Sequence, residues 1–197
     1  ITDRTFELGD FDEIDPIIGT AFGTLYNDNL FPVINAGNIM RTINKNDSFK
    51  IILFDLLIEN YDRNPGNLML DQKASKLYII DHSHTFNLGA LWDLNQLKFL
   101  SEVVRFDTNL LHKINYENLI QSIKFSDELR NEITDFIFKV KSIKLSAIKE
   151  IMSKIPDDWK VSKEEKEKLA EYIFERFQNV EKAAECLFGK EGDGSEV

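Results

Sequence analysis

The spacing of apolar residues along the chain predicts a mainly helical protein. Residues 48–60 are apolar almost throughout, which is typical of a helix that is buried on all sides. The charges that interrupt this segment are Lys50, Asp55 and Glu59. Other segments with apolar residues at helical spacing are 33–44, 90–100, 116–124, 127–141, 146–154 and 162–188. Ser126 and Ser162 are suitable N-cap residues for two of these helices, and Ser162 begins an S-x-x-E capping box.

Two short apolar runs that follow the buried segment predict a β-hairpin. The runs are residues 68–70 and 77–80, and the polar residues 71–76 between them have the length of a hairpin connection. The loop 61–67 before the hairpin contains Pro65-Gly66, which is a strong turn signal. We therefore expect the order buried helix, polar loop, hairpin and then further helices.

The composition fits a soluble globular protein and excludes several functional classes. The chain has 197 residues, and its 34 acidic and 24 basic side chains give a net charge of −10, which argues against nucleic acid as a partner. A single cysteine, Cys186, excludes a disulfide framework, and we expect it to be a small buried hydrophobe. The apolar stretch 51–58 is far shorter than the roughly 20 residues of a membrane span. We expect a cytoplasmic protein without a membrane partner, and the start at Ile1 suggests a fragment or a processed product.

Three polar residues around the predicted hairpin have the spacing that phosphoryl transfer requires. Asp62 lies in the loop before the hairpin, Asn67 follows five residues later, and Asp81 follows the second apolar run. Phosphoryl transfer needs a carboxylate for the hydroxyl proton and hard oxygen ligands for Mg²⁺, and the protein-kinase catalytic loop has an Asp and a metal-binding Asn at this separation. We expect Asp81 at a buried strand end, where a carboxylate needs partners. The alternative is that DRNPGN is only a polar turn that Asn67 caps.

Two histidines follow Asp81 directly and raise the question of a second metal site. His82 and His84 would point to the same side of an extended chain. The one remaining histidine, His112, is distant in the sequence and no cysteine is near, so a zinc site is the weaker interpretation. We expect instead that one imidazole packs under the loop and hydrogen-bonds to the backbone.

The segment 58–86 resembles the catalytic core of the HipA-like kinases, whose fold is related to protein kinases and phosphatidylinositol 3-/4-kinases. The resemblance rests on ENYDRNPGN and IIDHSHTF, and the second string is similar in particular to the compact bacterial subfamily. GTAFGTLY and IPDDW also resemble this family, so that the similarity extends over about residues 19–188. It implies a mainly α, protein-kinase-like large (C-terminal) lobe at 47–188, in which a short β-hairpin carries the metal-binding loop. Residues 1–46 would be the hinge segment that leads into the lobe, and 189–197 would be a disordered tail.

The same resemblance implies roles for individual residues. Asp62 would be the catalytic base, and Arg63 would hold the catalytic loop. Asn67 and Asp81 would bind the Mg²⁺ that accompanies ATP, and Asn67 would thus belong to both the catalytic loop and the metal site. The aromatic residues near the expected hinge, either of which would stack on the adenine, are Tyr26 and Phe31.

The chain departs from the family pattern in two respects. Asn64 stands where a histidine is common after Asp-Arg, and the sequence contains no recognisable strand lysine or Gly-rich loop of a small lobe. We therefore expect a kinase that transfers the γ-phosphoryl group of ATP to a hydroxyl of a protein (Ser or Thr) or of a small molecule. Its N-terminal lobe would be supplied in cis or in trans, and without that lobe the chain would be inactive. The alternative is a non-catalytic, pseudokinase-like helical interaction module.

Overall fold

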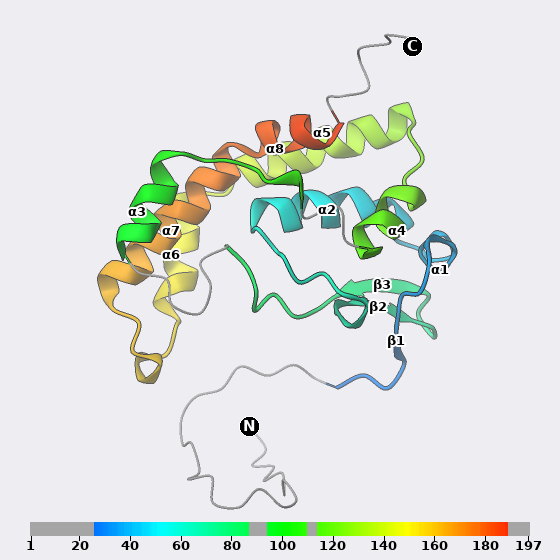
Figure 1. The fold of residues 1–197 in the computed structure, drawn as a ribbon, viewed down its shortest axis with the longest axis horizontal. Coiled ribbons are helices and arrows are strands. Elements are labelled where there is room, and N and C mark those ends of the chain that lie inside the picture. Colours follow the sequence, from blue (N-terminus) through cyan, green and yellow to red (C-terminus); the bar gives the residue numbers. More distant parts are fainter. Residues whose placement is uncertain (1–25, 87–93, 110–113, 189–197) are drawn as a thin grey trace, which may run out of the picture.

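The structure is a computed structural model that describes residues 26–86, 94–109 and 114–188 (Figure 1). It is mainly helical with one small antiparallel sheet, as the sequence predicts. The helices are α1 (Ala36–Met40), α2 (Ser48–Leu57), α3 (Leu94–Glu102), α4 (Ile114–Ser122), α5 (Asp127–Lys141), α6 (Leu145–Ser153), α7 (Lys163–Gln178) and α8 (Val180–Phe188). The strands are β1 (Leu30–Pro32), β2 (Leu68–Asp71) and β3 (Lys76–Ile79). Within the described ranges no helix is long and apolar enough to cross a membrane. The predictions for residues 1–25 and 189–197 lie outside these ranges.

Helix α2 is the centre of this fold. It lies between the sheet and the helices α5 and α8, and α4 packs beside it (Figure 1). Nearly all of its residues are buried, which explains why the sequence shows no polar face. The core residues that surround it come from several elements: Leu68, Leu77, Leu119, Val180 and Ala183. Because burial of a leucine or valine side chain contributes roughly 1.5–3 kcal/mol, α2 forms a firm platform for the loop that follows it.

The three strands form one sheet in the order β1-β2-β3. The hairpin of β2 and β3 confirms the sequence prediction, and its register sets Met69 opposite Tyr78. The sequence does not predict β1, because the strand has only three residues and ends in Pro32, a residue confined to sheet edges. The backbone N–H of Val33 donates to the carbonyl of Leu68 (2.9 Å) and continues the pairing. Within the described residues, the predicted hinge segment 1–46 is therefore hydrogen-bonded to the hairpin through β1 and Val33.

Local signals predict the C-terminal helices well, with one exception. The predicted capping box is present, because Ser162 Oγ accepts from the backbone N–H of Glu165 (3.2 Å) and the Glu165 carboxylate accepts from the N–H of Ser162 (2.7 Å). The single helix predicted over 162–188 is wrong, because α7 ends at Gln178 and α8 begins after Asn179. Asn179 Nδ2 donates to the carbonyl of Glu175 (2.8 Å), and this side-chain bond to the helix backbone accompanies the break.

Helix α8 also corrects the prediction for Cys186, which is exposed rather than buried. The buried residues of this helix are Val180, Ala183 and Ala184. They form the stripe that packs into the core, and Cys186 lies outside it. The apolar neighbours of Cys186 in the sequence therefore do not describe its surroundings in space.

Candidate functional site

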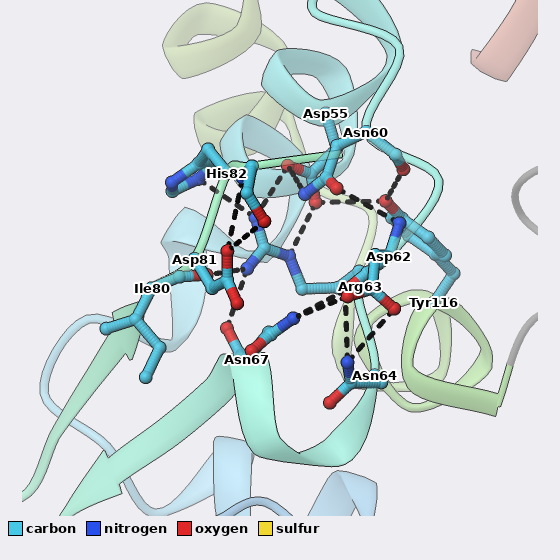
Figure 2. Close-up of polar contacts among 11 residues, drawn as sticks. Asp55, Asn60, Asp62, Arg63, Asn64, Asn67, Ile80, Asp81, His82 and Tyr116 are labelled. Atoms are coloured by element: carbon cyan, nitrogen blue, oxygen red, sulfur yellow. Dashed lines mark hydrogen bonds and ion pairs between the residues drawn. The ribbon is translucent and has the colours of Figure 1, made fainter. Parts of the chain in front are cut away.

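The predicted site residues lie in two loops that the backbone brings side by side. One loop follows α2 and leads into β2, and the other follows β3 (Figure 2). The N–H of Tyr61 donates to the carbonyl of His84 (3.2 Å), and the N–H of Phe86 donates to the carbonyl of Ile58 (2.6 Å). The N–H of Ile80 donates to the carbonyl of Asn67 (3.1 Å) and extends the hairpin ladder by one pair. These bonds place the loop that carries Asp62 against the loop that carries Asp81.

Asp62 and Asn67 are in direct contact. Asn67 Nδ2 donates to the backbone carbonyl of Asp62 (2.7 Å) and to its carboxylate Oδ2 (3.2 Å), and Asn67 is buried. Asn64 Nδ2 donates to the other carboxylate oxygen of Asp62 (3.0 Å), and Asn64 Oδ1 accepts from the N–H of Gly66 (2.8 Å). Asn64, the position at which the sequence departs from the family pattern, thus holds both the turn and the Asp62 carboxylate. Because the Asn67 amide nitrogen faces Asp62, its carbonyl oxygen Oδ1 is directed elsewhere and suits a cation.

Asp81 is held in an unusual backbone conformation at the end of the hairpin. Its φ is 50°, in the left-handed region that non-glycine residues rarely adopt. One carboxylate oxygen accepts from the hydroxyl of Ser83 (2.6 Å) and from its backbone N–H (3.1 Å), which leaves the second oxygen for another partner. These two bonds hold the pKa of the Asp81 carboxyl below its usual range. The prediction of a buried strand end is wrong, because β3 ends at Ile79 and Asp81 is exposed.

Arg63 connects the two loops and is fully buried. Its Nη1 donates to two backbone carbonyls, that of Asn67 (2.6 Å) and that of Ile80 (2.9 Å), as Figure 2 shows. Those carbonyls belong to one predicted metal ligand and to the residue immediately before the other, Asp81. Arg63 is thus hydrogen-bonded to the loop that it is expected to hold, and the same guanidinium is also bonded to the loop after β3.

Sequence reasoning missed Asp55, the carboxylate that pairs with Arg63. Asp55 lies in α2 and is fully buried, and its two oxygens accept from Arg63 Nε and Nη2, both at 2.8 Å. Asn60 Nδ2 and the hydroxyl of Tyr116 also donate to this carboxylate, both at 3.0 Å. Burial and the Asp55 charge together raise the pKa of Tyr116 above its ordinary value. The available signal was a carboxylate in an otherwise apolar helix, because a buried charge is costly without a partner.

His82 packs against this network, whereas His84 is exposed. The His82 ring contacts Phe54 edge to face, and its Nε2 lies 3.0 Å from Nη2 of Arg63. Because a guanidinium only donates, His82 Nε2 accepts this bond and the ring is neutral. Burial and the Arg63 charge lower the pKa of His82. The described residues contain no cluster of three or more His, Cys, Asp or Glu side chains able to hold a metal. The hydrogen bond of the His82 ring is with the Arg63 side chain, where the sequence predicts one with the backbone.

In the described part of the chain, Tyr26 and Phe31 are not joined to the site residues, although strand β1, which carries Phe31, lies against the turn Pro65–Asn67. Tyr26 is 92% exposed, and within the described residues no hydrogen bond or ring contact joins either ring to the loop around Asp62. Phe31 is paired with Leu70 and therefore lies on the sheet face opposite Met69.

An apolar row on the other face of the sheet leads directly to the site. Met69 is paired with Tyr78, and the ladder continues to the pair of Asn67 and Ile80. Since side chains alternate along a strand, these residues share one face. Tyr78 and Ile80 are 37% and 38% exposed, so this row is accessible beside Asn67 and Asp81. The sequence alternation in the hairpin contains this signal, but the strand register was needed to recognise it.

The comparisons with known proteins agree with the resemblance seen in the sequence. A family model described as HipA-like kinase matches residues 9–186, which is most of the chain. No curated protein and no solved structure matches the chain.

Proposed function

The chain belongs to the HipA-like kinase family, and we propose that it transfers the γ-phosphoryl group of ATP to a hydroxyl with the help of Mg²⁺. The observation that carries the proposal is the position of Arg63. One nitrogen of this buried side chain joins the backbone of Asn67 to that of Ile80, next to Asp81. The predicted base and the predicted metal ligands thus lie in two loops with a shared support, and phosphoryl transfer depends mainly on such positioning.

The oxygen donors of the two loops fit Mg²⁺. Mg²⁺ prefers hard oxygen ligands, and proteins often supply only one or two side chains while phosphate oxygens and water complete the shell. Asn67 would contribute its amide oxygen, because its nitrogen is bonded to Asp62. Asp81 would contribute the oxygen that Ser83 leaves free, and the bonds from Ser83 hold the pKa of its carboxyl below the ordinary value. When bound, the ion neutralises charge on the phosphates.

Asp62 has the surroundings expected of the group that receives the hydroxyl proton. Two amide nitrogens, from Asn64 and Asn67, hold its carboxylate in place. In the proposed reaction the substrate oxygen bonds to the γ-phosphorus while the bond from that phosphorus to the β–γ bridging oxygen breaks, and ADP leaves. The hydroxyl proton passes to Asp62, whose carboxylate is already oriented by the two amide groups before the substrate binds.

We further propose that the adenine lies on the apolar row of Met69, Tyr78 and Ile80. This row adjoins Asn67 and Asp81 on the accessible sheet face, and flat apolar surfaces with a few polar groups at one end are typical of such ligand sites. Tyr26 and Phe31 remain the alternative from the sequence. A lobe carrying a phosphate-binding lysine, in cis or in trans, would complete the site, and a protein Ser or Thr in the cytoplasm is the proposed acceptor.

The proposal is tested by Asp62→Asn and Asp81→Asn in the complete encoded protein. We expect Asp62→Asn to lower transfer of labelled γ-phosphate from ATP by about 100- to 10,000-fold, the range for loss of a proton-transfer group. Asp81→Asn, which removes a proposed metal ligand, should also lower this transfer. Asp135→Asn, an exposed carboxylate on α5, is the matched control and should retain activity. Wild-type turnover by Asp81→Asn would refute the metal assignment. Calorimetry with Mg²⁺ and ATP would separate the alternatives, because binding without transfer indicates a pseudokinase-like module.

A further inference from the structure

Asp55 is the one fully buried carboxylate among the described residues that neither belongs to a predicted catalytic position nor is accounted for by the family motif. It lies on α2, eight residues before Arg63 in the sequence, and faces the two loops of the site (Figure 2). Four hydrogen bonds reach its carboxylate, two from Arg63 and one each from Asn60 and Tyr116. These donors come from the loop after α2 and from α4, and together they fix the orientation of the carboxylate.

The shape of the guanidinium transmits this orientation to the site. Nε and Nη2 of Arg63 bind the two oxygens of Asp55 in a bidentate pair, both at 2.8 Å. A guanidinium is planar and rigid, so a bidentate pair on one edge determines where the remaining nitrogen points. That nitrogen, Nη1, donates to the carbonyls of Asn67 and Ile80. The position of Asp55 therefore sets where these two carbonyls are held.

We propose that Asp55 is a positioning residue that sets the separation of Asn67 and Asp81 through Arg63. It touches neither the metal ligands nor the proposed substrate, and it acts by linking the hairpin to the rigid helix α2. The chemical part of this inference rests on the proposed function. The mechanical part, that Asp55 keeps the two loops in register, does not depend on any reaction.

The matched control for this inference is Glu59. Like Asp55, it is buried, pairs with a buried arginine (Arg176, 3.2 Å) and accepts a hydroxyl hydrogen bond, in this case from Tyr172 (2.7 Å). The backbone carbonyls to which Arg176 donates are, among the described residues, those of Leu56, Leu57 and Arg105. Glu59→Gln therefore removes a comparable ion pair next to the same helix without touching the proposed support of the site.

The first measurement is amide hydrogen exchange on Asp55→Asn and Glu59→Gln, without any ligand. We expect exchange at the amide of Ile80, which donates to Asn67, to be faster by about tenfold or more in Asp55→Asn, the size of a lost charge-assisted hydrogen bond. In Glu59→Gln this amide should exchange as in the wild type. Equal changes in both variants, or none in a folded Asp55→Asn, would overturn the inference. Arg63→Lys gives the second variant, because it keeps the buried positive charge but loses the fork, and it should reproduce the selective effect.

The second measurement is the affinity for Mn²⁺ in the presence of a non-hydrolysable ATP analogue. We expect Asp55→Asn to weaken it by about 10- to 100-fold, the usual effect of losing a group that orients a metal ligand, and Glu59→Gln to leave it unchanged. If the wild type binds no Mn²⁺, and Asp81→Asn is equally inert, the proposed function fails. The exchange measurement still decides in that case whether Asp55 holds the two loops. Unchanged Mn²⁺ affinity in Asp55→Asn would overturn the positioning role.

Discussion

Two buried arginines, Arg63 and Arg176, support different parts of the molecule with the same chemistry. Arg63 is completely buried and Arg176 is 2% exposed. Arg63 pairs with Asp55 inside α2, and Arg176 pairs with Glu59 just after its end. In both places a tyrosine hydroxyl donates to the carboxylate, and the arginine also donates to backbone carbonyls.

The carbonyls that the two arginines reach are different in kind. Arg176 donates to the carbonyls of Leu56 and Leu57, which close the C-terminal end of α2, and to that of Arg105 (3.1 Å). Such carbonyls at a helix end lack partners within the helix and must find them elsewhere. Arg63 instead binds the carbonyls at the junction of the hairpin and the loop around Asp62. One arginine therefore completes a helix, and the other connects two loops that carry candidate site residues.

This difference shows that burial and pairing alone do not identify a functional charge. Both ion pairs carry a cost of removing charge from water, and both offset it through several hydrogen bonds. What distinguishes Arg63 is the destination of its third nitrogen. Variants that remove each ion pair in turn test whether the two networks differ, provided that stability and metal binding are measured separately.

The largest effects are expected for Arg63→Met and Arg176→Met. Each change leaves a buried carboxylate without its counter-charge, so each should lower the free energy of unfolding by about 3–5 kcal/mol. Urea unfolding followed by circular dichroism measures this loss. Metal binding should separate the two variants, because only Arg63→Met releases the carbonyls of Asn67 and Ile80. A loss below about 1 kcal/mol in either variant would contradict the reading of these pairs as essential buried partners.

Double variants provide the control. Asp55→Asn with Arg63→Met, and Glu59→Gln with Arg176→Met, remove both charges and should each recover most of the lost stability. Affinity for Mn²⁺ with an ATP analogue should stay low in the first double variant, whereas the second double variant should bind Mn²⁺ as the wild type does. Recovery in the first would show that the site does not depend on the Arg63 bonds.

The sequence could predict those features of the fold and of the candidate site that depend on neighbouring residues. Residues near one another in the chain determine the two helix starts, at Ser126 and at Ser162, and the hairpin. The close spacing of Asp62 and Asn67 is local in the same way. The family resemblance added the grouping of these residues with Asp81. The break at Asn179 was missed because the apolar spacing continues across it.

The remaining parts depend on contacts between distant segments. Tyr116 donates to Asp55 across 61 positions of sequence, and Arg176 donates to Leu56 across 120. No periodicity or capping rule connects such residues. Asp55 was visible as a charge in an apolar helix, but its partner could be chosen only when the structure placed Arg63 beside it.

A smaller effect is expected when each tyrosine loses its hydroxyl. Tyr116→Phe removes donations to Asp55 and to the carbonyl of Asn60, and Tyr172→Phe removes the one to Glu59. Each should cost about 1.5–3 kcal/mol in the free energy of unfolding, the value for hydrogen bonds to charged groups. We expect a several-fold loss of Mn²⁺ affinity for Tyr116→Phe and none for Tyr172→Phe. The reverse order of metal affinities would remove the distinction between the two networks.

The smallest effect is a dependence on pH that only the Arg63 network should show. His82 accepts from Arg63, and its pKa is lowered in the folded protein by burial and by that charge. The unfolded chain therefore binds this proton more readily, so the stability contributed by neutral His82 is fully present above the ordinary pKa of about 6.5 and is lost as the pH falls through the lower folded value. Between pH 7.5 and 5.0 the wild type should lose more free energy of unfolding than His82→Gln, while His84→Gln, a change at an exposed ring, should behave as the wild type. The difference between the wild type and His82→Gln measures what the His82 imidazole contributes, and identical pH profiles would show that its protonation does not disturb the contact with Arg63.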